Sequence, residues 1–192
     1  ECLKFYKNKT LERTSLFFQD LKIRDEKNII NGKKCPKIFD LYNFINWQEL
    51  SNGIPARIHG DFHFENIVVK KNNDFKFIDW RQSFGSILKY GDIYYDLAKL
   101  MHGLIVSHKI IIKEKYQINV VKNKFTYKIT KPKINTMYEK IFVDWCKNNQ
   151  FDVKKIYIIT SLIFLNIAVL HHRPYNLFLF ALGKDMLTKN LD

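Results

Sequence analysis

The sequence has few of the residues that build disulfide frameworks, thiolate metal sites or glycine-rich loops. Its three cysteines, Cys2, Cys35 and Cys146, lie far apart and form no CxxC pair, which excludes a disulfide scaffold and a cysteine-ligated metal site. The seven glycines include no GxG pair, so a glycine-rich phosphate-binding loop is absent from these residues. The sparse cysteines favour a reduced, cytoplasmic compartment.

Long apolar segments are also missing. The longest, residues 156–170, is interrupted by Thr160, Ser161 and Asn166. A helix needs about 20 consecutive apolar residues to cross a bilayer. We therefore expect this segment to form a buried core helix and predict no membrane span.

Acidic residues are outnumbered, because 32 Lys and Arg residues against 19 Asp and Glu residues give a net charge of +13. A charge of this size raises nucleic acid as a partner. Surfaces that bind phosphates usually rely on the bidentate arginine fork, and the arginines here are few. They are Arg13, Arg24, Arg57, Arg81 and Arg173. The lysines are spread along the whole chain, so we do not expect direct nucleic-acid binding.

Hydrophobic residues make up 46% of the 192 residues, which is enough for one domain over residues 1–192. Two hairpins are expected, one over 67–78 around the turn 71–74 and one over 110–130 around Lys122–Asn123. The second lies within an apparent insertion, 108–132, that could be a lid or a partner-binding surface. Apolar spacing predicts helices over 9–24, 38–50, 92–106, 135–149, 152–172 and 175–190. The fold class is therefore α+β.

One constellation carries chemistry: the segment IHGDFHFENI, the hairpin that follows it, and then FIDWR. Asp61 precedes Asn66 by five residues, and Asp79 ends the returning strand of the hairpin. A short hairpin brings its two ends together, so Asn66 and Asp79 should converge beside Asp61. One amide and one carboxylate oxygen suit Mg²⁺, which takes its other ligands from water and phosphates. A neighbouring carboxylate can accept the proton of an attacking hydroxyl, as in phosphoryl transfer.

Three ordered blocks, HGDFHFENIVV, FKFIDWR and YGDIYYDLAK, resemble the aminoglycoside phosphotransferase and choline kinase superfamily of small-molecule kinases. The resemblance covers residues 57–103, with the catalytic loop and metal hairpin at 57–81. It implies the mostly helical C-terminal lobe of a protein-kinase-like fold, and ATP and Mg²⁺ as cofactors. Residues 1–192 would then form this lobe alone.

The resemblance also implies roles for individual residues. Asp61 would be the catalytic base or the carboxylate that orients the hydroxyl, and Asn66 and Asp79 would hold the metal. Three further residues would support the catalytic loop: His59, Asp92 and Asp96. Each of these has a plainer explanation, since His59 could be a packed loop histidine, and Asp92 could simply cap the helix that follows it.

The acceptor pocket is expected near the residues after Asp79. Arg81 suits a phosphate or carboxylate on the acceptor, or else pairs with one of the two later aspartates and fixes the loop. Trp80 could stack on a sugar ring or pack in the core. Two histidines complete the candidate acceptor residues: His63, which could equally be half-exposed without a task, and His172 at the end of a helix.

The small nucleotide-binding lobe of such kinases is not found here, since neither a GxG loop nor a strand lysine precedes the first helix. With Glu1 as the first residue, we expect a fragment of a longer protein, inactive in isolation. The predicted function is an ATP- and Mg²⁺-dependent phosphotransferase acting on a hydroxyl of a small polar acceptor. Sugars, amino sugars and choline-like alcohols remain open as acceptors, and the favoured setting is cell-surface polysaccharide or lipid synthesis. The alternative is a non-catalytic pseudokinase or partner-binding module.

Overall fold

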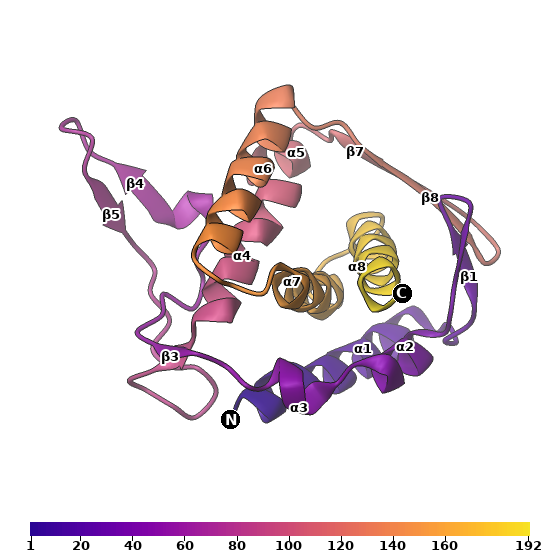
Figure 1. Ribbon diagram of the computed structural model, residues 1–192. Helices are drawn as coiled ribbons and strands as arrows, with labels where there is room; N and C mark the ends of the chain where they lie inside the picture. Colours follow the sequence, from indigo (N-terminus) through magenta and orange to yellow (C-terminus); the bar gives the residue numbers. More distant parts are fainter.

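The computed structural model describes residues 1–192 and has the expected α+β architecture (Figure 1). A π-helical turn, η1 (Lys4–Asn8), runs directly into the first α-helix, and a 3₁₀ turn, η2 (Phe64–Asn66), follows the catalytic loop. The α-helices are α1 (Lys9–Leu21), α2 (Ile38–Phe44), α3 (Trp47–Leu50), α4 (Ile93–Ile105), α5 (His108–Ile112), α6 (Lys133–Asn148), α7 (Val153–Ala168) and α8 (Tyr175–Leu191).

The strands form three small sheets. The largest has the order β2-β1-β8-β7 and consists of β1 (Asn28–Ile30), β2 (Lys33–Cys35), β7 (Tyr116–Val121) and β8 (Lys124–Ile129). In this sheet β1 runs parallel to β8, and the two other pairs are antiparallel. The remaining pairs are antiparallel: β3 (Pro55–Ala56) with β6 (Gly91–Asp92), and β4 (Ile67–Val69) with β5 (Phe75–Phe77).

Helix α7 forms the centre of the core, because its apolar residues cover every face rather than one stripe. It packs against α8, α4, α1 and α6, which surround it in Figure 1. Ile156 and Phe164 of α7 are fully buried, as is Phe178 of α8. No helix combines the length and the apolar content that a membrane crossing requires. The three cysteines are free thiols.

Four expectations about the elements need correction. The first helix ends at Leu21 and extends N-terminally through η1. The segment 38–50 forms two helices, because Asn46 accepts a hydrogen bond from the Glu49 backbone N–H at 3.2 Å and starts α3 separately. The residues 108–112 are helical, so the second hairpin covers only 116–129. The segment 25–37, for which no helix or strand was predicted, contains the hairpin β1–β2.

The second hairpin is also part of the body of the domain and not a free lid. Its strand β8 pairs with β1, and the Tyr127 hydroxyl donates a hydrogen bond to Asp185 of α8 at 2.6 Å. By contrast, β4 and β5 project away from the helices in Figure 1, and every residue from Val68 to Gln82 is exposed to solvent. The hairpin that carries the predicted metal ligands is therefore the least covered part of the molecule.

Candidate active site

The catalytic loop is anchored to the first turns of α4. Asp96, buried in α4, accepts hydrogen bonds from the backbone N–H groups of His59 (2.6 Å) and Gly60 (2.8 Å). Burial raises the pKa of Asp96, while these two N–H donors counteract part of that effect. The carboxylate thus fixes the backbone immediately before Asp61.

His59 connects the same loop to the end of the metal hairpin. Its Nε2–H donates to the Ile78 carbonyl oxygen at 2.8 Å, and its Nδ1 accepts from the Asp61 backbone N–H at 3.2 Å. Its own carbonyl oxygen accepts from the Arg81 backbone N–H at 2.9 Å. Because both ring nitrogens are used and only 4% of the residue is exposed, His59 holds the site together and faces no substrate.

Asp92, four residues before Asp96, also accepts several hydrogen bonds at the start of α4. One carboxylate oxygen caps α4 by accepting from the Tyr94 N–H and also accepts from the Ile54 N–H, both at 3.1 Å. The other oxygen accepts from the Tyr6 hydroxyl at 2.8 Å. Capping of α4 and attachment of η1 therefore account for Asp92, which is 1% exposed.

Asp61 lies between two cationic side chains. The Lys99 ammonium is 2.7 Å from Oδ1, and His63 Nε2 is 3.5 Å from Oδ2. Partial burial by itself would raise the pKa of Asp61, but the hydrogen bond from His63 and the Lys99 ammonium outweigh it and lower the pKa well below its usual value. Asp61 is therefore a carboxylate at neutral pH, able to accept a hydrogen bond and poor at retaining a proton.

His63 is held between two carboxylates. Its Nδ1 lies 2.9 Å from Glu65 Oε2, opposite the contact with Asp61. The hydrogen bonds with Asp61 and Glu65 raise the pKa of His63 to about 9, and the bond with His63 lowers the pKa of Glu65 to about 2. His63 is thus an imidazolium at neutral pH, facing the catalytic carboxylate.

The hairpin brings the two predicted metal ligands to the same end. Ile67 pairs with Phe77, and the Ile78 N–H donates to the Asn66 carbonyl oxygen at 3.0 Å, so Asp79 follows directly. The Asn66 amide donates to the Asp61 carbonyl oxygen at 2.9 Å, which links the predicted metal and catalytic positions.

The donor chemistry of this pair fits a hard cation. Neither the amide oxygen of Asn66 nor the Asp79 carboxylate has a hydrogen-bond or ion-pair partner. Asp79 has a left-handed backbone with φ +59°, a conformation uncommon for non-glycine residues and frequent at functional sites. No group of three or more His, Cys, Asp or Glu residues forms a metal cage. Two oxygen ligands alone are what Mg²⁺ uses when phosphates and water complete its shell.

The predicted acceptor residues divide into three kinds. Trp80 packs on the His59 ring with centroids 4.8 Å apart and donates through Nε1 to the Phe77 carbonyl oxygen, while 54% of it stays exposed. Arg81 forms no ion pair with Asp92, with Asp96 or with any other acidic residue. Its side chain lines a pocket below the loop. His172, in the exposed α7–α8 connection, makes no side-chain hydrogen bond or ion pair.

Two residues of the site were missed by the sequence analysis, namely Lys99 and Glu65. Lys99 lies three residues after Asp96 on α4, a spacing that places both on one helix face toward the catalytic loop. That spacing was a usable signal. Nothing in the local sequence indicated that Glu65 accepts a hydrogen bond from His63 and another from the His108 N–H at 3.1 Å.

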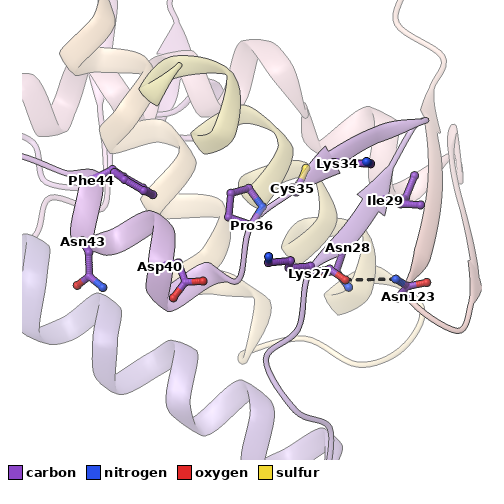
Figure 2. Close-up of a pocket in the computed structure, with 10 residues that line it drawn as sticks. All are labelled: Lys27, Asn28, Ile29, Lys34, Cys35, Pro36, Asp40, Asn43, Phe44 and Asn123. Atoms are coloured by element: carbon purple, nitrogen blue, oxygen red, sulfur yellow. Dashed lines mark hydrogen bonds between the residues drawn. The ribbon is translucent and has the colours of Figure 1, made fainter.

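A large hollow on the surface lies elsewhere. Figure 2 shows this groove of about 800 Å³, lined by residues of β1, β2 and α2, including Asn28, Cys35 and Phe44. An Asn123 side chain closes one end by donating to the Lys27 carbonyl oxygen at 3.3 Å. None of the candidate site residues lines this groove.

Comparison with known proteins shows a family similarity for the segment that contains this site. Residues 20–109 match the family model described as the phosphotransferase enzyme family. This stretch is just under half of the chain and contains all three sequence blocks around Asp61, Asp79 and Asp96. Searches of curated proteins and of solved structures gave no match. Over this segment the chain is similar to the phosphotransferase enzyme family, in agreement with the resemblance of its three sequence blocks to aminoglycoside phosphotransferases and choline kinases.

Proposed function

We propose that the protein is an ATP- and Mg²⁺-dependent phosphotransferase that acts on a hydroxyl of a small polar acceptor. The observation that carries this proposal is the link between Asn66 and the Asp61 carbonyl oxygen at 2.9 Å, with Asp79 at the adjoining end of the hairpin. A carboxylate for the hydroxyl and two oxygen ligands for a metal are thereby gathered on one loop and one strand end. Cytoplasmic ATP would be the phosphate donor.

In this proposal Asp61 binds and orients the acceptor hydroxyl. Its lowered pKa keeps it ionised, so it accepts the hydroxyl hydrogen bond in the ground state and takes the proton as the oxygen attacks phosphorus. Lys99 and His63 fix the carboxylate and limit its basicity. Asn66 and Asp79 would hold Mg²⁺, which when bound neutralises charge on the transferred phosphoryl group.

A nucleotide-binding lobe outside these residues completes the proposed enzyme. The hairpin exposes apolar side chains that a folded protein normally covers, including Val69 (60% exposed) and Phe75 (62% exposed). We propose that the nucleotide lobe packs over this hairpin and places the ATP phosphates against Asp79. The 192 residues alone would then lack half of the ATP site and turn over slowly or not at all.

A non-catalytic pseudokinase or partner-binding module is the second candidate. The observation that favours it is the ion pair between Lys99 and Asp61 at 2.7 Å. A carboxylate so stabilised is a weak proton acceptor. Activity measurements on the complete protein separate the two candidates.

The test of the proposed function is Asp61→Asn in the protein expressed with its nucleotide lobe. We expect phosphoryl transfer to fall by about 10²–10⁴, the usual effect of losing a general base, with ATP affinity nearly unchanged. Asp144→Asn, on the exposed face of α6 away from the hairpin, is the matched control and should leave transfer unchanged. Equal transfer by wild type and Asp61→Asn would remove Asp61 from the mechanism, and no transfer by the wild type would favour the pseudokinase.

A further inference from the structure

A small cavity lies directly beneath the catalytic loop. It has a volume of about 90 Å³ and is enclosed by η1 and α1, by α4 and by α7. The α7 wall is mostly apolar, with Ile159, Leu162 and Ile163, and also contains the polar residue Asn166. Since a cavity needs roughly 10–15 Å³ of this kind of volume to hold one water molecule, the cavity has room for a small polar group.

The polar part of the cavity is cationic. Lys9, Arg13, Arg81 and Lys99 all line it, and no acidic residue does. Three different segments supply these side chains, so the clustering arises from tertiary structure and not from a local run of basic residues. Lys99 has an ion-pair partner in Asp61, whereas the other three have none.

The present contacts leave much of this charge uncompensated. Arg13 donates to the Asn166 carbonyl oxygen at 3.1 Å, and Lys9 lies 4.3 Å from the centroid of the Phe5 ring. Burial, and then the neighbouring cations Arg13, Arg81 and Lys99, lower the pKa of Lys9 to about 8. Gathering like charges in a half-buried site destabilises the protein unless an anion occupies it.

The cavity adjoins the reacting groups. Lys99 contributes to its lining and also contacts Asp61 at 2.7 Å, so the cavity ends next to the catalytic carboxylate. The stem of Arg81 packs against Gly60, where an added Cβ would lie 2.7 Å from the Arg81 Cβ. Arg81 thus contacts the catalytic loop through its stem and also lines the cavity.

We propose that this cavity binds an anionic group, a phosphate or a carboxylate, of the hydroxyl-bearing acceptor, an inference that rests on the proposed phosphotransferase function. Two arginines and two lysines provide the charge-assisted donors that such a group requires. The remainder of the acceptor extends toward Asp61 with its hydroxyl. Choline-like and polycationic acceptors are disfavoured, because they would place a positive charge among four others.

The test uses inorganic phosphate and acetate as probes of the two anionic groups. Each is titrated into the 192-residue chain at constant ionic strength in chloride, and binding is measured by isothermal titration calorimetry. We expect saturable binding of at least one anion at one site. Arg81→Gln and Lys9→Gln should each weaken that binding tenfold or more, because each removes a charge-assisted contact. Arg81 is exposed, so its replacement should not disturb folding, which circular dichroism checks.

Arg57→Gln is the matched control, because it removes one exposed arginine that does not line the cavity. Absence of saturable binding by both anions, or equal weakening by Arg57→Gln and Arg81→Gln, would overturn the proposal. In the complete enzyme, Arg81→Gln should raise the KM for an anionic acceptor much more than it changes kcat. Preference for a neutral acceptor over its phosphorylated or carboxylated analogue would also overturn it. Anion binding requires neither ATP nor phosphoryl transfer. A failure of the anion titration can therefore be distinguished from a failure of the Asp61→Asn activity test.

Discussion

Four aspartates around the catalytic loop differ in where their oxygen lone pairs are used. Asp92 and Asp96 are buried and accept hydrogen bonds on both oxygens, mostly from backbone N–H groups. Asp61 instead faces cationic side chains, and Asp79 has no partner. Carboxylates saturated by the backbone stabilise the fold, whereas carboxylates that face side chains or solvent are free to bind ligands. This difference separates supporting residues from reactive ones.

The charge state of His63 gives a prediction on pH. Its pKa is raised from 6.5 to about 9 by Asp61 and Glu65, so the folded state binds this proton more tightly than the unfolded state. The stabilisation is fully present below pH 6.5 and is lost as the pH rises through about 9. We therefore expect the free energy of unfolding, measured by urea titration, to fall between these two pH values.

His63→Gln is the comparison for that measurement, because it removes the titrating group and keeps a side chain of similar length. Its unfolding free energy should be flatter over the same pH interval. An NMR titration of the wild type should place the His63 midpoint near pH 9. A midpoint near 6.5 would show that the two carboxylates do not hold the proton.

Gly60 and Gly32 provide a matched pair at the residue scale. Both have a left-handed backbone, with φ +78° at Gly60 and +81° at Gly32, but only Gly60 has a close neighbour. Gly32→Ala should cost about 1–2 kcal/mol of unfolding free energy, the conformational cost of a side chain in this region. Gly60→Ala should cost more, because its Cβ would lie 2.7 Å from the Arg81 Cβ.

Urea unfolding of both variants measures this difference. A loss that is equal in the two variants would mean that Arg81 moves away freely and that its stem is not fixed against the loop. In that case the position of Arg81 at the cavity would lose its structural support.

The proximity of the candidate site residues could be predicted from sequence, and the position of their charged neighbours could not. Asp61, Asn66 and Asp79 are spaced by one loop and one hairpin, so local geometry predicts their proximity. Lys9 and Arg13 reach the same region from a helix more than forty residues upstream in the sequence. The packing of α1 against α7 places Lys9 and Arg13 there, and no local sequence pattern predicts this tertiary contact.

At the scale of elements, the start of α4 shows how one cap supports the site. Asp92→Ala removes the N-cap and leaves the Tyr6 hydroxyl and the Ile54 N–H without an acceptor. We expect it to lower the free energy of unfolding by about 2–4 kcal/mol, combining the loss of a cap with unpaired buried donors. Urea unfolding monitored by circular dichroism measures the change.

Asp152→Ala is the matched control, since Asp152 caps α7 through the Lys155 N–H at 3.0 Å and is exposed. It should lower the free energy of unfolding by about 1 kcal/mol, the usual value for a cap alone. If Asp92→Ala costs no more than Asp152→Ala, the contacts of Asp92 with Tyr6 and Ile54 contribute little to stability.

Element prediction succeeded where the apolar pattern is long, or where a turn-rich tetrapeptide separates two β-type runs as in the 67–78 hairpin, and it failed where neither signal is present. Helices over α4, α6, α7 and α8 follow from apolar spacing sustained over several turns. The strands β1 and β2 contain three residues each, too few to show alternation, and lie in a segment rich in Lys and Asn. The two strands are held in the sheet because β1 pairs with β8. In this pairing Ile29 lies opposite Lys124, ninety-five residues later in the sequence. Such a distant partner cannot be seen in a local window.

At the scale of the whole molecule, the active site lies at an edge of the domain. The helices enclose α7, and the catalytic hairpin projects from one side, while the four-stranded sheet lies on the other side of α7 (Figure 1). That sheet packs on α8 and is part of the helical body. It therefore cannot act as the sheet that covers ATP in protein-kinase-like folds.

The last prediction concerns nucleotide binding by these 192 residues. Kinases of this kind hold the phosphates of ATP with a flexible loop and a strand lysine paired with a helix glutamate. The chain contains no GxG loop, and its lysines near Asp61 and Arg81 lie in the cationic cavity beneath the catalytic loop. We expect Mg-ATP to bind with a Kd weaker than about 1 mM, the upper end of usual KM values, when measured by isothermal titration calorimetry. The protein with its nucleotide lobe should bind far more tightly in the same titration. Tight binding by the 192 residues alone would mean that Asp79 and its neighbours form the nucleotide site without a second lobe.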